Sequence, residues 1–268
     1  MPHRIEILRT GYPERPGMDT ALSHAILLRA SAGELGETIR LHRPGPVVAF
    51  GRRDVVDPRF DAAVAATRAE GFEAVERLAG GRAAVFHRGT IAFAWAFPDA
   101  APRDRVHHRF DRVAGVMADS LRRLGVDARI GEVPGEYCPG SHSVNVEGRR
   151  KVMGVGQRLV ARAAHVGGVI VVDGAAEVRR VLSPVYRELG ISWDPDTTGD
   201  LASILPGIDL EKVVGAVLDR VAEEAELVEV EPDPETLALS ERLAPRHIVD
   251  RSAQPVPKVS ASLTAEKE

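Results

Sequence analysis

Hydrophobic residues recur along this chain of 268 residues with two different periodicities. Apolar positions spaced three and four apart are typical of helices, whereas alternation or a short apolar run is typical of strands. The helical periodicity covers residues 18–32, 57–71, 103–124, 175–182, 209–224 and 234–244. Strand-like segments cover residues 5–8, 38–42, 47–50, 73–78, 90–97, 152–160, 165–172 and 227–230. The mixture predicts an α+β fold, a mostly antiparallel β-sheet with helices packed on it.

Single residues sharpen some of these boundaries. Asp57 is expected to cap the second helix, with Pro58 in its first turn. Asp209 is expected to cap the fifth helix in the same way, and the fourth helix is expected to end before Ser183-Pro184. The segment 165–172 is almost wholly apolar, which predicts a strand in the centre of the sheet.

No linker divides the predicted elements, so residues 1–250 are expected to form a single domain. Beyond Arg251 the sequence is rich in Ser, Pro, Ala and Lys and has no periodicity. The segment 251–268 is therefore predicted to be a disordered tail.

Composition excludes several classes of protein. The chain is 44% hydrophobic and 28% charged with a net charge of −4, which argues against a nucleic-acid partner. No apolar run is long enough to cross a bilayer, and the N-terminus has no apolar leader segment. The single cysteine excludes an internal disulfide and a cysteine-rich zinc site. We therefore expect a cytoplasmic protein, without a metal and as a monomer.

The single cysteine lies in the segment 136–157, EYCPGSHSVNVEGRRKVMGVGQ. Pro139-Gly140 predicts a turn at Cys138, and Gly148 permits a tight reversal into a strand that begins at Lys151. A thiol close to a cationic amine can act as a nucleophile. Each residue also has a structural interpretation. A lone cysteine such as Cys138 is a small buried hydrophobic residue about as often as not. On composition alone, Lys151 is better interpreted as a surface residue.

A second segment, RLAGGRAAVFHRG over residues 77–89, contains two adjacent glycines between predicted strands. Glycine lets a ligand approach the backbone, and its exposed N–H groups, helped by Arg77 and Arg82, could hold a phosphate or a carbonyl oxygen. A glycine-dependent hairpin with solvated arginines explains the pattern equally well. His87 in this segment is more often structural than catalytic.

Three segments in order resemble the lipoate-protein ligase and octanoyltransferase superfamily, whose fold is shared with biotin protein ligases. They are residues 43–52, with VVAFGR, residues 77–93, and residues 148–158, GRRKVMGVGQR, followed by HVGGVIVV. The resemblance covers residues 4 to 250. It implies that the Gly-Gly segment is the lipoate-binding loop and that Lys151 contacts the acyl carbonyl. The cysteine context resembles octanoyltransferases with a cysteine nucleophile, so Cys138 and Lys151 are the implied catalytic residues.

The same resemblance implies a set of substrate-binding residues: Arg77, Gly80, Gly81, His87, Gly154 and Gln157. Two features depart from the family pattern. Ser141, His142 and Ser143 stand where an acidic residue often follows the cysteine loop, and the turn before Lys151 is one residue longer.

Three hypotheses follow. In the first, acyl carrier protein or the glycine-cleavage H protein donates an octanoyl or lipoyl group to Cys138, and a lysine of a lipoyl domain accepts it, without ATP or a metal. Arg149, Arg150 and Arg158 are then candidates for contact with acidic partner surfaces. In the second, an ATP-dependent ligase holds an acyl-adenylate with the Gly-Gly segment and Lys151. The third is a catalytically silent protein that binds acyl carriers.

Overall fold

The computed structural model describes residues 3–249, in which a large mixed sheet lies between two pairs of helices. The eight strands, in spatial order, are β11 (Glu226–Glu229), β1 (Arg4–Leu8), β2 (Thr38–His42), β6 (Thr90–Pro98), β10 (Ala163–Val171), β9 (Arg150–Leu159), β8 (Val144–Val146) and β7 (Ala128–Ile130). Pairing is antiparallel from β2 to β7, whereas β1 runs parallel to both of its neighbours. The expected α+β class and mostly antiparallel sheet are confirmed.

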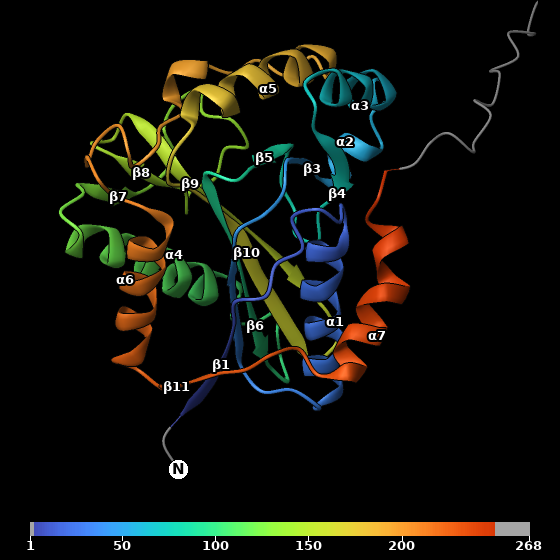
Figure 1. Cartoon of the computed structure of the whole chain (residues 1–268), viewed down its shortest axis with the longest axis vertical. Coiled ribbons are helices and arrows are strands. Elements are labelled where there is room, and N and C mark those ends of the chain that lie inside the picture. Colours follow the sequence, from blue (N-terminus) through green and yellow to red (C-terminus); the bar gives the residue numbers. More distant parts are fainter. Residues whose placement is uncertain (1–2, 250–268) are drawn as a thin grey trace, which may run out of the picture.

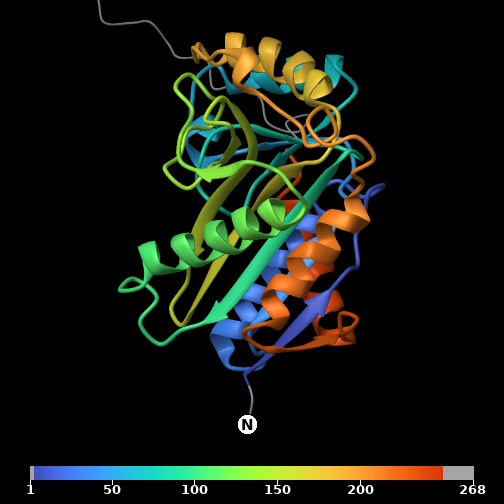
Figure 2. The same cartoon turned by 90° about the vertical axis from the view of Figure 1, so that its left-hand side faces the viewer.

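Helices cover both faces of this sheet. In Figure 2, α4 (Val106–Arg123) and α6 (Leu210–Ala222) lie in front of it, while α1 (Met18–Ala32) and α7 (Pro234–Leu243) lie behind. Trp95 and Phe93 of β6 pack toward α4 and α6 in the main hydrophobic core. Ala96 of the same strand faces α1, where it contacts Leu22 and Ile26. The period-two alternation of β6 therefore supplies two cores, one for each face.

A small second sheet lies above one end of the large one, in the order β4 (Glu73–Glu76), β3 (Val47–Phe50) and β5 (Ala84–Phe86). Figure 1 shows α3 (Phe60–Ala69) and α5 (Ala175–Glu188) across the top of the molecule, with the short α2 (Arg52–Val55) beside β3. These helices and the small sheet share a separate apolar core around Phe50, Phe60 and Val185. Short 3₁₀ turns at Pro195–Thr197 and Ala244–Arg246 complete the elements.

Two predicted helix boundaries are wrong. The helix expected to end before Ser183-Pro184 continues through Pro184 to Glu188. The buried apolar stripe of α5 extends past the proline to Val185 and Tyr186, and we attribute the continuation to this packing, which outweighs the loss of one backbone hydrogen bond. Asp57 does not cap a continuous helix, because α2 ends at Val55 and α3 begins at Phe60.

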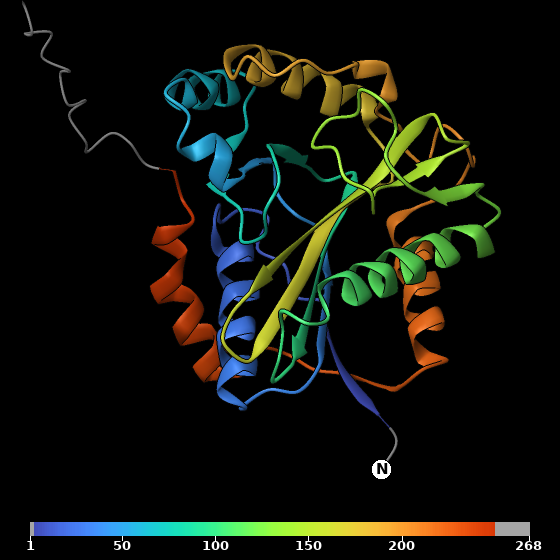
Figure 3. The ribbon, with the colours of Figure 1, turned by 180° about the vertical axis from the view of Figure 1, so that it is seen from behind.

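The paired strands β9 and β10 bring the segments of interest together. Seen from behind in Figure 3, they run diagonally between α1 and α4. The expected central position of the apolar strand is confirmed, because β10 pairs with β6 on one side and β9 on the other. No helix within residues 3–249 combines the length and apolar character needed to span a membrane. The predicted tail at 251–268 lies outside the described residues.

Candidate active site

Cys138 lies in the long connection between β7 and β8, in a backbone conformation that is rare for this residue type. Its φ angle is 43°, in the left-handed region, where the backbone of any residue other than glycine is strained. The half-buried thiol turns toward the Gly-Gly segment. The backbone N–H of Arg82 lies 3.2 Å from Sγ, and Arg77 Nη1 lies 3.7 Å away. The loop therefore presents its sulfur to a donor and a positive charge.

Lys151 is buried with 1% of its side chain exposed, so it is not a surface residue. Its Nζ donates to Glu136 Oε1 at 2.9 Å and to the carbonyl oxygens of Tyr137 at 2.9 Å and Cys138 at 2.8 Å. An ammonium group has three N–H donors, and each one is engaged. Lys151 does lie next to Cys138, as the segment predicted, but it binds the backbone of the cysteine loop rather than the thiol.

Glu136 is the buried anion that balances this lysine. It also accepts from the backbone N–H of Val133 and Gly140 and from the Ser143 hydroxyl, at 3.0, 3.2 and 2.6 Å. The family pattern places an acid after the cysteine loop, whereas the acid in this chain lies two residues before the cysteine. The signal available in the sequence was an acidic residue two positions before the cysteine.

Tyr186 of α5 connects the cysteine loop to the glycine segment. Its buried hydroxyl accepts from the Cys138 N–H at 3.0 Å and donates to the Ala83 carbonyl at 2.9 Å. Burial, followed by the nearby Cys138, raises the pKa of Tyr186 well above its usual value, so it remains a neutral hydroxyl. No local signal in the sequence indicates this residue, which is 48 positions away and follows the proline expected to end its helix.

The two glycines of the predicted binding loop have different environments. A Cβ at Gly81, whose φ is 117°, would lie 2.8 Å from the Cys138 sulfur, so only glycine allows the loops to approach this closely. A Cβ at Gly80 would have no atom within 4 Å, and the Gly80 N–H points to the Gln157 carbonyl at 3.4 Å. Gly81 therefore shapes the thiol site, while Gly80 leaves open space.

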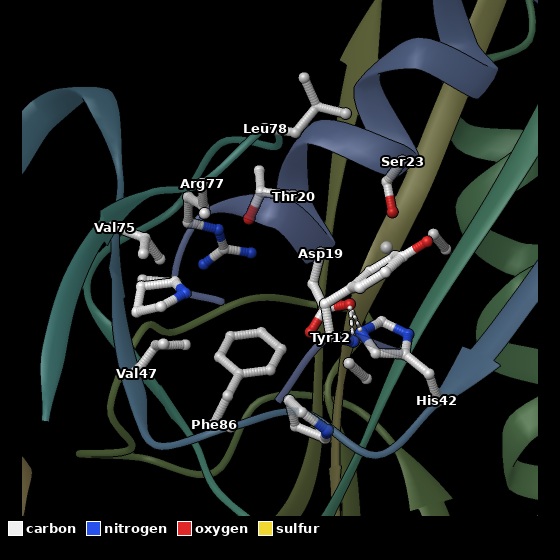
Figure 4. Close-up of a pocket in the computed structure, with 18 of the residues that line it drawn as sticks. Tyr12, Asp19, Thr20, Ser23, His42, Val47, Val75, Arg77, Leu78 and Phe86 are labelled. Carbon is white, nitrogen blue, oxygen red and sulfur yellow. Dashed lines mark hydrogen bonds and ion pairs between the residues drawn. The ribbon is translucent and has the colours of Figure 1, made fainter. Parts of the chain in front are cut away.

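A pocket lies between α1, the small sheet and one face of the large sheet (Figure 4). Small residues of the large sheet form its floor, namely Ala92, Ala94, Gly167 and Gly168. Arg77 belongs to the pocket wall as well as to the surroundings of Sγ. A pocket with a mainly apolar floor, whose wall includes the arginine that contacts the thiol, suits an extended acyl chain.

Of the six predicted substrate-binding residues only Arg77 lines this pocket; the other five, Gly80, Gly81, His87, Gly154 and Gln157, lie outside its wall. His87 is buried beside Glu177, and burial lowers its pKa so that the ring is neutral. Gln157 bonds Arg109 through its side-chain oxygen at 2.8 Å. A Cβ at Gly154 would lie 3.2 Å from Lys151 Cε, so this glycine gives the lysine room.

Comparison with known proteins gives a consistent picture. The family model described as "Lipoyl protein ligase A/B catalytic domain" matches residues 15–222. The Octanoyl-[GcvH]:protein N-octanoyltransferase of Geobacillus kaustophilus is 29% identical over 170 residues, which are 63% of this chain and 60% of that protein. The Lipoyl-[GcvH]:protein N-lipoyltransferase of Listeria monocytogenes is 26% identical over 135 residues, 50% of this chain and 48% of that one.

A solved structure extends the likeness to the fold. The bipartite lipoate protein ligase of Thermoplasma acidophilum, solved in a study of that ligase and its E2 lipoyl domain, has a TM-score of 0.68 and 16% identity, covering 91% of this chain and 93% of that one. At this identity only the fold is shared, and the chain spans about 60% of the length of its Geobacillus relative. The family match nonetheless covers most of the chain, and the resemblance noted in the sequence is confirmed. The chain belongs to the lipoyl protein ligase A/B catalytic domain family.

Proposed function

We propose that this protein transfers an octanoyl or lipoyl group from a carrier protein to a lysine of an acceptor lipoyl domain, through a thioester on Cys138. One observation carries the proposal: the Cys138 sulfur lies next to the Arg82 N–H and to Arg77, a residue that also lines a pocket with a mainly apolar floor. A positive charge and an N–H donor are the neighbours that stabilise a thiolate. Similarity to relatives named octanoyl- and lipoyl-transferases supports the acyl group.

The first step exchanges one acyl bond for another. The Cys138 sulfur attacks the donor carbonyl carbon, the bond to the carrier breaks, and the thiol proton ends on the departing carrier group. A thioester donor makes this step nearly isoenergetic, whereas an amide donor makes it uphill and dependent on the acceptor. The Arg77 guanidinium is the charged donor beside the reacting sulfur, so we assign it the developing oxyanion.

In the second step an acceptor lysine amine attacks the acyl-Cys138 carbonyl. An amide forms, the carbon–sulfur bond breaks, and the amine proton returns to the thiol. Lys151 acts through the loop rather than on the acyl group, because its three donors hold Glu136 and two loop carbonyls. Neither step requires ATP or a metal.

The printed names of the relatives support the glycine-cleavage H protein as donor, with acyl carrier protein as the other candidate. Arg149, Arg150 and Arg158 are exposed and remain candidates for binding an acidic partner surface. The fold shared with a bipartite lipoate ligase keeps an ATP-dependent ligase as the second candidate. In that reaction an acyl-adenylate replaces the acyl-cysteine. The cytoplasmic location expected from the sequence stays a prediction.

Intact-mass measurement tests the proposal. The protein is incubated with octanoyl carrier protein or octanoyl H protein without ATP, and then with a lipoyl domain. Because Cys138 is the only cysteine, an octanoyl adduct that hydroxylamine removes is expected on the wild type and is expected to be absent from Cys138→Ala. Ser141→Ala, an exposed change in the same loop, is the matched control and is expected to form the adduct.

Each other outcome has a definite meaning. A wild-type protein that forms no adduct from either donor contradicts the thioester route. Adenylate formation from free lipoate and ATP, with Cys138→Ala fully active, supports the ligase. Failure of both reactions leaves the silent carrier-binding protein.

A further inference from the structure

The short helix α2 lies against the Gly-Gly segment that faces the thiol. It begins directly after Gly51, where a Cβ would lie 1.8 Å from the Gly81 carbonyl oxygen, so only glycine allows this contact. Asp54 of α2 is buried and pairs with Arg82 at 2.9 Å, and the Arg82 N–H lies 3.2 Å from the Cys138 sulfur. Two direct contacts therefore connect α2 to the reacting atom.

The outer side of α2 carries two positive charges and ends at an apolar residue. Arg52 and Arg53 are both exposed, and 80% of the Arg52 side chain is accessible. Arg52 lies 3.9 Å from Glu76, at the limit of an ion pair, and Arg53 has no ion pair within residues 3–249. Val56, directly after α2, is 64% exposed, more than any other large hydrophobic residue described. Arginine beside apolar contact area is typical of protein–protein interfaces.

The charge on α2 is uncancelled, although the chain as a whole is acidic with a net charge of −4. Other exposed arginines are neutralised by neighbours. Arg123, for example, pairs with Glu223 at 2.5 Å. Arg129 pairs with Asp127 at the same distance. Both glycines of the Gly-Gly segment are exposed and Cys138 is half-buried, so a protein that reaches the thiol over this segment passes α2.

We propose that the α2 surface, defined as Arg52, Arg53 and Val56, docks an acidic face of the carrier protein that donates the acyl group. This inference rests on the proposed function, in which a carrier brings the acyl group to Cys138. The donor is the occupant because it must place an acyl chain in the pocket lined by residues 77–79, and α2 contacts the same segment. An acceptor brings only a lysine side chain to the sulfur. Exposed charges of this kind act mainly on the association rate, and salt screens them.

Steady-state transfer of octanoyl to a lipoyl domain tests the inference on the full chain. In a two-step exchange, kcat/KM for the donor reports only the donor step, and kcat/KM for the lipoyl domain reports only the acceptor step. The donors are octanoyl H protein and a small uncharged thioester, octanoyl-N-acetylcysteamine. In Arg52→Glu/Arg53→Glu at low salt, kcat/KM for the H protein is expected to fall about tenfold. The value for the small thioester is expected to stay unchanged. Added salt is expected to reduce the difference between wild type and variant.

Arg162→Glu is the matched control for the change in charge. Arg162 is exposed, has no ion pair within residues 3–249 and lies in the turn between β9 and β10. This turn follows the end of β9 opposite Lys151, whose Nζ binds the Cys138 carbonyl. At about 3.3 Å per residue, β9 places Arg162 roughly 30 Å from Lys151. The control is therefore expected to keep the wild-type kcat/KM for both donors.

The outcomes separate this inference from the proposed function. An unchanged kcat/KM for the H protein in the double variant overturns the inference and leaves acyl transfer in place. An equal loss in Arg162→Glu, or with the small thioester, also overturns it, because net charge or a distorted thiol site then explains the effect. A loss confined to kcat/KM for the lipoyl domain assigns α2 to the acceptor and overturns the choice of donor.

The small thioester also reports whether each variant is folded. If the double reversal does not fold, Arg52→Gln/Arg53→Gln removes the same charges without adding repulsion, and the same loss of kcat/KM for the H protein is expected in a smaller degree. If the wild type forms no adduct on Cys138 from either donor, the proposed function falls and this inference falls with it.

Discussion

Replacing Lys151 by Met tests whether this lysine serves the loop or the substrate. The change keeps the length of the side chain and removes three hydrogen bonds, two of them to backbone carbonyls of the cysteine loop. It also leaves Glu136, whose side chain is 0% exposed, as an unpaired buried charge. Removing one partner of a buried ion pair costs about 3–5 kcal/mol. Since domains unfold with a total of about 5–15 kcal/mol, Lys151→Met is expected to lose a large part of its stability.

The double variant Lys151→Met/Glu136→Gln is the matched control. Glutamine keeps an acceptor for Gly140 and Ser143 and carries no charge, so the buried anion is gone, although the hydrogen bond from the Val133 N–H is lost because the glutamine NH2 then faces it. We expect the double variant to regain about half of the lost free energy of unfolding. Urea denaturation followed by circular dichroism measures the free energy of unfolding of the wild type and both variants. The midpoint of the transition shifts with stability, and the slope of the free energy against urea concentration reports the surface exposed on unfolding.

The result that refutes this reasoning is a Lys151→Met protein as stable as the wild type that forms no acyl adduct on Cys138. Lys151 would then act on the acyl group directly, as the family resemblance implied. A destabilised Lys151→Met that still forms the adduct at low temperature supports the structural role.

Three further predictions follow from the same contacts. Tyr186→Phe is expected to lose about 1–3 kcal/mol in urea denaturation, because the Cys138 N–H and the Ala83 carbonyl lose their shared partner, and to slow adduct formation measured by intact mass. Gly81→Ala is expected to abolish adduct formation while the chain still folds, since its Cβ would lie 2.8 Å from the sulfur; an active Gly81→Ala contradicts the site geometry. Burial, then the charges of Arg77 and His24, lowers the pKa of His165 to about 3. The unfolded chain therefore binds this proton first, and stability is expected to fall by roughly 4 kcal/mol as the pH drops from about 6.5 to 3, less steeply in His165→Leu.

The fold was predictable wherever the spacing of hydrophobic residues matched only one kind of element, a helix or a strand. The helix at 18–32 and the strands at 38–42 and 47–50 have the predicted bounds, because their apolar spacing and the flanking Gly and Pro residues agree. Local signals failed where tertiary packing decided the outcome. Pro184 is a strong local helix breaker, yet the buried stripe that continues to Tyr186 outweighs it.

The candidate site was predictable only in its local part. A turn at Cys138 and a strand from Lys151 could be read from one segment, and the structure places the two residues in contact. Tyr186 and the pocket residue His42 reach the site through long-range packing, and no pattern near them in the sequence indicates that they meet it. A lysine beside two arginines also resembles a surface residue until the burial of its strand is known.

The hydrogen-bond inventory around the thiol decides how the oxyanion is stabilised. In this structure the Cys138 N–H is committed to Tyr186, the Gly140 N–H to Glu136, and all three donors of Lys151 to the loop. Pro139 has no N–H to offer. The donors that face the sulfur are then the Arg82 N–H and the Arg77 guanidinium, whose Nη1 also donates to the Arg82 carbonyl at 3.1 Å and which alone carries a charge. Because a charged donor stabilises developing negative charge more than a neutral one, Arg77 rather than Lys151 is the residue on which the rate of acyl transfer should depend most directly.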